Sequence, residues 1–244
     1  MRLFNIPTML AASVLLCVIA PPADAIDVTP MVQTITPTGG GSTYRLSVKN
    51  TDDQAVTVEL QVFEMKVDEN GLRTLSEEVK DLAIFPPQSV IPPNREQVIQ
   101  VRYIGPADAP PRMYLVRVGQ LPITFSSDPA ASSGAAVQVA FNVNTHVLLA
   151  PAGASPMVRV LSTRVADNGD VLIVAENQGA GFAALRQARY TLTAADGRTV
   201  QVRSEDVVLG QVSTLPGGAR RNIRIPAAVA AGIGAGATAS IELS

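Results

Sequence analysis

The sequence predicts an all-β protein built from two antiparallel sandwiches. Apolar and polar residues alternate with a period of two in many short segments from residue 26 onward. These segments recur at a spacing of about ten residues and are separated by turns rich in Gly, Pro, Asn and Asp. No long amphipathic helical pattern lies between them, which disfavours a parallel α/β sheet.

The first 25 residues have the layout of a secretory signal peptide. Arg2 precedes an apolar run over residues 9–20, and Ala23 and Ala25 supply the small residues of a cleavage site. The run is shorter than the roughly 20 residues that span a bilayer. A lipoprotein signal at Cys17 is disfavoured because Leu16, not a small residue, precedes it. We therefore expect cleavage after Ala25 and an exported chain with no stable membrane insertion.

The first sandwich is expected over residues 26–150. Its clearest alternating segments are residues 43–48, 55–62 and 96–103. Turn-forming residues separate them at positions 38–42, 50–53, 68–71 and 92–94. This pattern is typical of half-buried strands in an antiparallel sheet.

A second sandwich is expected over residues 156–244, after a linker at 151–155. The segments that look like strands are 158–165, 170–175, 190–193, 200–208, 220–225 and 237–243. A domain this short has a small core, so we expect it to lean on the first for stability. The Ala- and Gly-rich stretch 226–239 fits either a helical turn or a loop.

Composition disfavours several classes of function. The chain has 19 Lys and Arg against 21 Asp and Glu, so no basic excess is available for nucleic acid. One His and one Cys argue against a metal site, a Cys–His nucleophilic pair or a disulfide framework. The three glycines at 39–41 lack the Lys-Ser/Thr of a phosphate loop and fit a hairpin turn better. We therefore predict no catalytic centre, no metal and no cofactor.

Residues 136–149 form an unusually long alternating segment. Fully extended, they would exceed about 40 Å, more than twice a typical strand. Val137, Val139, Phe141 and Val143 share one face, and the stretch contains no charged residue and no Pro to blunt an edge. A small-residue linker at 126–135 precedes it. The segment is either a long core strand or an edge strand that is offered to another chain.

Several short stretches resemble the periplasmic chaperones of the chaperone–usher pilus pathway. In order along the chain they are residues 26–31, 46–50, 84–88, 91–94, 98–103, 112–114, 120–122 and 149–151. The Ile-Phe-Pro-Pro-Gln at 84–88 and Gln-Leu-Pro at 120–122 look like the non-typical, archaic or spore-coat branch. The similarity lies in the order and spacing of these pieces and is best in the first domain.

The resemblance implies two immunoglobulin-like domains in an L with a cleft between them. It also implies a periplasmic, non-enzymatic chaperone that binds pilus subunits and delivers them to an outer-membrane usher without ATP. The subunit-binding residues would be those of the long strand, Val137, Val139, Phe141 and Val143. The turn at Leu121, Pro122 and Ile123 would be an apolar corner that covers them or meets the usher.

One feature departs from this family. Many members bind the terminal carboxylate of the pilin with an Arg in the first strand and a Lys near the end of the long strand. Here those positions fall near Gln33 and on His146, neither of which is permanently charged. Arg112 and Arg117 are substitute candidates on the neighbouring strand. A lone His on an apolar strand is otherwise usually structural, so that interpretation of His146 stays open.

The alternative to a chaperone is a secreted two-domain structural or adhesive protein that keeps the long strand in its own core. A carbohydrate-binding module is less favoured, because the chain has no Trp and only four Tyr to stack on sugars. Co-expression with candidate pilins discriminates between the first two interpretations, since only a chaperone should be purified as a stoichiometric pair.

Overall fold

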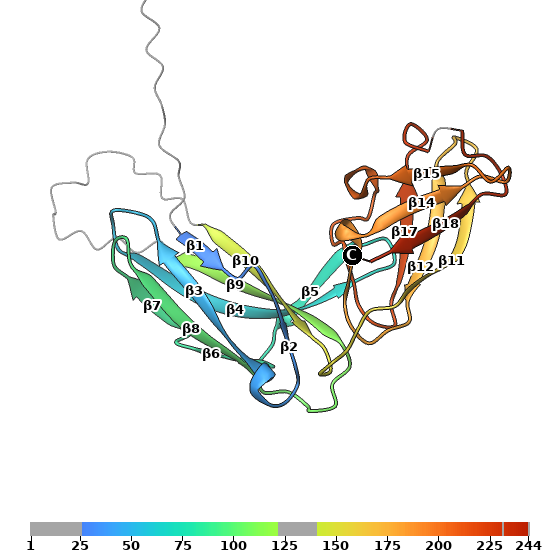
Figure 1. The fold of residues 1–244 in the computed structure, drawn as a ribbon. Helices are drawn as coiled ribbons and strands as arrows, with labels where there is room; N and C mark the ends of the chain where they lie inside the picture. The colour runs from blue at the N-terminus through green and yellow to red at the C-terminus, as the bar shows by residue number, and fades with distance from the viewer. Residues whose placement is uncertain (1–25, 122–140, 231, 244) are drawn as a thin grey trace, which may run out of the picture.

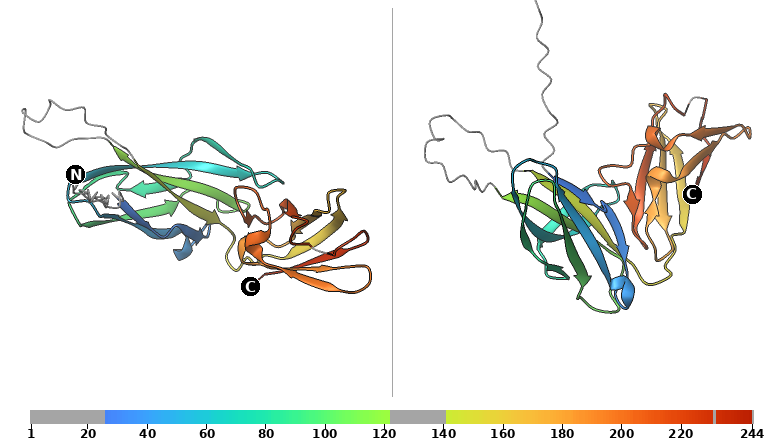
Figure 2. Two further views of the ribbon diagram at one scale, coloured as in Figure 1. Left: turned by 90° about the horizontal axis from the view of Figure 1, so that it is seen from above. Right: turned by 60° about the vertical axis from the view of Figure 1, so that its left-hand side comes forward.

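The computed structural model describes residues 26–121, 141–230 and 232–243. Figure 1 shows two bodies of β-strands joined at an elbow, and the two views of Figure 2 show the same bent, L-like arrangement. The prediction of two β-sandwiches in an L is confirmed. The expected signal peptide lies outside the described residues, as do Pro122, Ile123, Val137 and Val139. Within the described ranges, no helix is long and apolar enough to cross a membrane.

Two sheets form the first sandwich. The first sheet contains, in spatial order, β1 (Ile26–Thr29), β3 (Thr43–Asn50), β8 (Glu96–Tyr103) and β6 (Leu82–Phe85). The second contains β2 (Val32–Ile35), β10 (Asn142–Leu149), β9 (Arg112–Leu121), β4 (Val56–Val67) and β5 (Arg73–Glu78), with β7 (Gln88–Ile91) paired to β4. All these pairs are antiparallel except that of β10 with β2, which is parallel.

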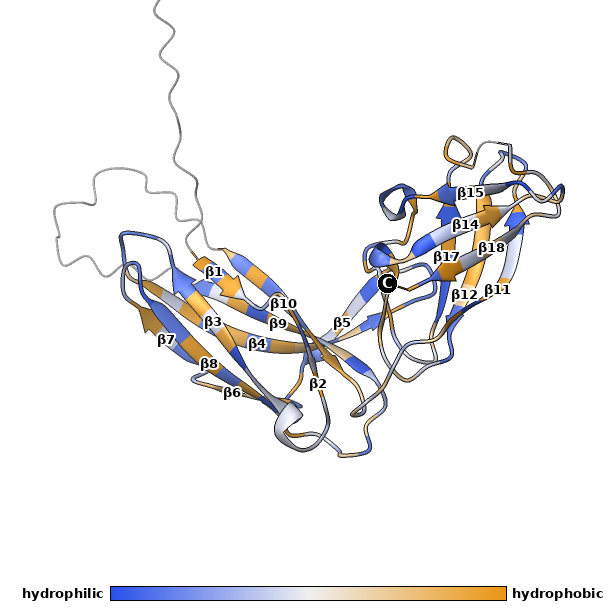
Figure 3. Cartoon of the chain, viewed as in Figure 1, coloured by the Kyte–Doolittle hydropathy of each residue, from blue (hydrophilic) through white to orange (hydrophobic). Residues whose placement is uncertain are grey.

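The period-two pattern explains how these strands bury a core. On β3, Tyr44, Leu46 and Val48 are buried, while the residues between them face outward. The same alternation runs along β8 and appears in Figure 3 as hydrophobic and hydrophilic bands along the strands. Strand β4 continues five residues beyond the expected 55–62, to Val67, with a register shift between Phe63 and Met65. The hairpin turn expected at the three glycines 39–41 is wrong: they lead into a short 3-10 turn, η1 (Gly40–Ser42), and the strands on either side, β2 and β3, lie in different sheets.

The second sandwich has smaller sheets. One contains β11 (Val158–Val165), β12 (Val171–Asn177) and β17 (Arg220–Ile225), and another contains β15 (Thr199–Val202), β14 (Arg189–Thr193) and β18 (Thr238–Glu242). A two-stranded pair joins β13 (Ala183–Ala184) to β16 (Thr214–Leu215). Two 3-10 turns complete it, η3 (Leu185–Gln187) and η4 (Ser204–Asp206).

One sequence expectation for this sandwich is wrong, and one pair of open alternatives is decided. The strand expected over 200–208 ends at Val202, because the chain turns into η4, where Arg203 contacts Asp206 at 3.0 Å. For 226–239 the alternatives were a helical turn and a loop, and its described part is a series of turns that leads into β18. Its first turn closes with hydrogen bonds from the Val229 and Ala230 N–H groups to the Pro226 carbonyl.

The tip of the β4–β5 hairpin connects the two sandwiches. The N–H groups of Gln211 and Val212 both donate to the Gly71 carbonyl, at 2.9 and 3.1 Å. Gly71 lies against Gly210 so closely that a Cβ on either would fall 2.1–2.2 Å from a backbone oxygen of the other side. Both glycines have a φ near +80°, a conformation that costs other residues energy. The tip is therefore seated by backbone contact that only glycine permits.

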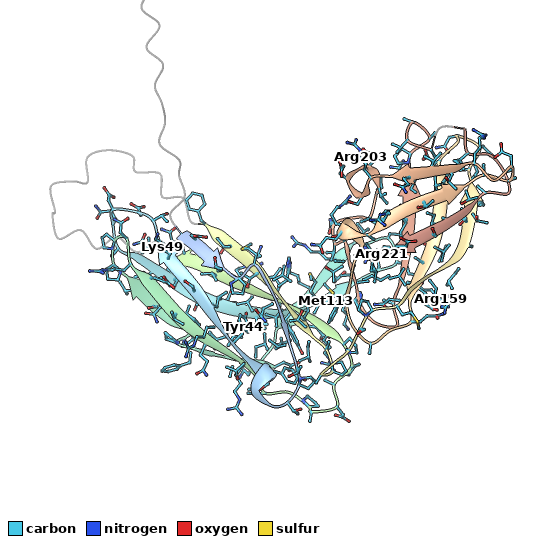
Figure 4. All side chains as sticks on the ribbon, viewed as in Figure 1. Tyr44, Lys49, Met113, Arg159, Arg203 and Arg221 are labelled. Carbon is cyan, nitrogen blue, oxygen red and sulfur yellow. The ribbon has the colours of Figure 1, made fainter. Side chains whose placement is uncertain are left out.

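Apolar side chains and a buried arginine support this junction. Met65, Met113 and Leu148 of the first sandwich form a small cluster with Phe182 and Val212 of the second. Beside the hairpin tip, Arg221 is fully buried and donates to the carbonyls of Leu209, Val212 and Thr214. Figure 4 shows Met113 and Arg221 on the two sides of the elbow. The dependence of the second sandwich on the first for stability stays a prediction.

Candidate functional site

Strand β10 has a neighbour on both sides along only half of its length. On one side β9 pairs with it from Asn142 to Leu149. On the other side β2 pairs with it only from His146 to Leu149. No described strand pairs with residues 142–145 on that second side. Among the described strands, half of this strand therefore has an open edge on one side.

The backbone hydrogen bonds show which groups face the open side. The Phe141 carbonyl accepts from the Gln120 N–H at 2.9 Å, whereas the His146 N–H donates to the Met31 carbonyl at 2.8 Å. In an antiparallel pair, successive residues direct their N–H and C=O groups to opposite sides. The backbone groups of Asn142 and Asn144 therefore point away from β9, into the open side. An added strand would find its partners there.

The odd-numbered side chains of β10 face the sandwich interior. Val147 and Leu149 are fully buried, and Val143 is half-buried against the same core. Phe141, just before the strand, is 37% exposed. The structure thus gives Val143 a packing role within the first sandwich and leaves Phe141 the more accessible of the two. Val137 and Val139, which share this face in the sequence pattern, lie outside the described residues.

The even-numbered side chains face the opposite surface of the sheet. His146 lies opposite Leu115, which in turn pairs with Phe63 on β4. One row further along, Asn144 lies opposite Arg117. His146 and Arg117 therefore share one face, in neighbouring rows. Of the four anchor candidates, these two lie on this outward face of the sheet.

Arg117 lies over an aromatic ring. Its guanidinium carbon is 4.7 Å from the centroid of the Phe63 ring, and its Nε is 3.5 Å from Oδ1 of Asn144. No described carboxylate forms an ion pair with it. A guanidinium over an aromatic ring can still donate through its Nη groups. Arg117 can therefore bind an anionic group arriving at this face.

His146 lies in a less polar environment than Arg117. Its Nε2 atom is buried and has no hydrogen-bond partner among the described residues. Burial lowers the pKa of His146, and the positive charge of Arg73 on β5 lowers it further. The imidazole is therefore neutral at pH 7 in the free protein. No pattern in the sequence points to Arg73, because only the fold of the β4–β5 hairpin brings its charge to His146.

Gln33 and Arg112 lie elsewhere. Gln33 is registered with Val147, on the inward side, and its Nε2 donates to the Thr34 carbonyl. The residue opposite His146 is Val32, which is 55% exposed. Arg112 is at the other end of β9, where its Nη1 lies 3.5 Å from the Asp81 carboxylate. Neither residue shares the face of His146.

The expected apolar corner is described only at its first residue. Leu121 ends β9 and pairs with Thr57 of β4, which also pairs with Val90 of β7. Leu121 is partly exposed and Val90 is 52% exposed. Pro122 and Ile123 lie outside the described residues. Leu121 and Val90, on either side of Thr57, therefore place apolar side chains beside the described end of β9.

Comparison with known proteins adds independent information. Residues 28–155 match the family model described as pili and flagellar-assembly chaperone, PapD N-terminal domain. No curated protein sequence gives a significant match.

Solved structures share the fold at low identity. The class 5 fimbriae chaperone CfaA is 8% identical, with 90% of this chain and 99% of CfaA covered and a TM-score of 0.57. The chaperone YadV is 13% identical, with 89% and 92% covered and a TM-score of 0.56. A structure of the Salmonella enterica SafA pilin in complex with the SafB chaperone matches at 12% identity, with 85% and 86% covered and a TM-score of 0.54.

Proposed function

Because this chain belongs to the family of pili and flagellar-assembly chaperones, we propose that it holds a pilus subunit along the open half of β10. The observation that carries the proposal is the side of residues 142–145 that no described strand covers, on a strand whose other side is paired along its whole length. Complementation of pilins by chaperones is an established form of strand addition. In the solved complex named above, a chaperone of the same fold accompanies a pilin.

The physical basis is a shared sheet and a shared apolar core. The backbone groups of Asn142 and Asn144 would bond to a strand of the pilin, which gives affinity that tolerates sequence variation. Phe141, with Val137 and Val139 before it, would fill the pilin's groove. Each large apolar side chain buried in this way contributes roughly 1.5–3 kcal/mol. Val143 would continue the row while it packs against the chaperone's own core.

Arg117 and His146 are the residues we assign to the terminal carboxylate of the pilin. Both face the same surface, and Arg117 keeps free donors over the Phe63 ring. A carboxylate beside them would favour the charged imidazolium and raise the pKa that burial lowers. Arg73 adds positive charge at the same place. Gln33 and Arg112 are not assigned to this role.

The remaining features follow the same proposal. The protein is exported to the periplasm after cleavage behind Ala25, which intact-mass measurement of the exported chain tests. Residues 26–150 form the chaperone domain, 151–155 the linker and 156–244 the second domain. The apolar corner at Leu121, Pro122 and Ile123 covers the subunit-binding residues or meets the usher. No reaction is catalysed, and no cofactor is required for capture.

Replacing Phe141 with aspartate tests the proposal. An unpaired carboxylate in an apolar groove costs several kcal/mol, so co-purification with a co-expressed pilin should be lost. The chaperone itself should stay folded, because the Phe141 side chain is 37% exposed in the free protein. Val98→Asp is the matched control, since Val98 is 48% exposed on the outer face of the other sheet.

Circular dichroism of each variant alone separates binding from folding. Pilin capture by Phe141→Asp at the wild-type level would refute the assignment of this strand. Wild-type chain that is purified alone, with every pilin tested, would instead favour a structural sandwich. If Phe141→Asp unfolds, the side chain belongs to the chaperone's own core, and the assignment is wrong.

A further inference from the structure

The outer face of the second sandwich carries a hollow away from β10. The hollow has a volume of about 540 Å³ over the sheet formed by β11, β12 and β17. Its floor includes Leu172 and Val174, and Val208 at its side is 40% exposed. Asn70, at the tip of the β4–β5 hairpin, lines it as well. Both sandwiches therefore contribute to its wall.

The strand register arranges the side chains on this face in three rows. The first row is Arg159–Glu176–Arg220, the second Ser162–Val174–Asn222 and the third Arg164–Leu172–Arg224. The outer rows are four residues apart along β12, which corresponds to about 13 Å in a strand. Arginines thus occupy the four corners of a patch with an apolar centre. We refer to these nine residues as the arginine face.

The positive charge on this face exceeds its negative charge. Arg220 contacts Glu176 at 3.0 Å, and Arg224 contacts Asp170 at 3.1 Å. Arg159 and Arg164, both on β11, form no ion pair with any described residue. Figure 4 shows Arg159 on the outer side of the second sandwich. Two cations are therefore available to an incoming anion.

The distribution of charge along the chain supports this. Residues 156–244 contain nine Arg, no Lys and seven Asp and Glu, for a formal charge of +2. Residues 26–155 contain nine Lys and Arg against 13 Asp and Glu, for a formal charge of −4. Arginine binds carboxylates through two parallel N–H groups, which a lysine cannot do. The second domain is thus the part suited to an acidic partner.

We propose that the arginine face binds an extended acidic segment of a protein partner. In an extended segment, alternate side chains point to the same side, and residues i and i+4 are as far apart as the outer rows. Acidic residues at i and i+4 would meet the arginines of the outer rows. An apolar residue at i+2 would rest on Val174 in the middle row. This site is independent of the pilin-binding strand.

A peptide of matched spacing tests the inference. The probe is the capped peptide Glu-Ser-Leu-Ser-Glu, and its control is Ser-Glu-Leu-Glu-Ser, which has the same composition and the wrong spacing. Binding is measured by titration of the isotope-labelled full mature chain, followed by NMR. We expect shifts at β11, β12 and β17 and an affinity about fivefold higher for the matched peptide, which corresponds to one favourable ion pair.

Variants assign the effect to the arginines. Arg164→Gln should weaken the matched peptide about fivefold and leave pilin capture unchanged. Arg203→Gln is the control, since Arg203 is exposed and lies at the far end of the same sandwich from Arg159 (Figure 4). Its affinity for the peptide should equal that of the wild type.

Four results would overturn the inference. The first is equal affinity for the two peptides, and the second is no binding of either. The third is binding to vesicles that contain phosphatidylglycerol, lost in Arg164→Gln, without peptide binding, because it would assign the face to an anionic membrane. The fourth is self-association that Arg164→Gln abolishes, because it would make a second copy the occupant.

Discussion

Replacing Gly71 with alanine tests how firmly the β4–β5 hairpin holds the two sandwiches together. Gly71 has a φ of +76°, and an added Cβ would lie 2.1 Å from the Leu209 carbonyl oxygen and 2.6 Å from Nη1 of Arg221. The carbonyl is backbone, and Arg221 is fully buried and bonded to three carbonyls, so neither can yield easily. The hairpin tip must therefore move away from the second sandwich.

The magnitude follows from two contributions. An alanine at positive φ costs about 1–2 kcal/mol through its backbone alone. Withdrawal of the tip also breaks the hydrogen bonds that the Gln211 and Val212 N–H groups donate to Gly71, each worth about 0.5–1.5 kcal/mol. We therefore expect a loss of about 2–5 kcal/mol in total. Gly197→Ala is the matched control, since Gly197 has a φ of +86° and no atom within 4 Å of an added Cβ.

The assay compares both variants with the wild type. Urea unfolding followed by circular dichroism gives the loss in stability, and small-angle X-ray scattering gives the angle between the sandwiches. Gly197→Ala should show only the backbone cost and keep the wild-type scattering profile. Gly71→Ala should lose more stability and show a wider range of interdomain angles. Equal losses for the two variants, with unchanged scattering, would refute the tight seating of the hairpin.

Two further predictions concern β10. The pKa of His146 is lowered in the folded protein, so the unfolded chain takes up a proton first as the pH falls through about 6.5, and the free chaperone loses stability there. A bound carboxylate raises the pKa of His146 again, so pilin capture should strengthen as the pH falls toward 6. The His146→Gln variant should lose this pH dependence. Matching pH profiles for the wild type and His146→Gln would exclude His146 from the anchor. Asn144→Pro removes an N–H that faces the open edge, whereas Val143→Pro removes one that faces β9. Asn144→Pro should weaken pilin capture, measured by co-purification, and keep the wild-type thermal unfolding. Val143→Pro should lower the thermal stability. Equal effects of the two variants would contradict the orientation of the backbone groups at this edge.

The sequence by itself predicted the strands of this protein and the direction of their side chains. Alternation with a period of two gives the strands and the face of each residue, because successive side chains of a strand point to opposite sides. It therefore predicted that Val143 shares a face with Phe141. The order of short motifs along the chain also indicated the chaperone family, which the match over residues 28–155 confirms. Alternation did not predict where the strand expected over 200–208 ends, because the chain leaves the sheet after Val202 and turns into η4.

Only the tertiary structure shows which strands and which charged residues lie beside β10 and His146. Alternation does not specify which strand lies beside which. Strand β2 joins β10 from more than a hundred residues away and covers residues 146–149 on one side, which no other described strand extends. The same register puts Val32, not Gln33, opposite His146. Arg112 forms an ion pair with Asp81. The β4–β5 hairpin brings Arg73 close enough to His146 for its positive charge to lower the pKa of the imidazole. These contacts join residues distant in sequence, and their energies depend on strand pairing and burial that a linear pattern does not contain.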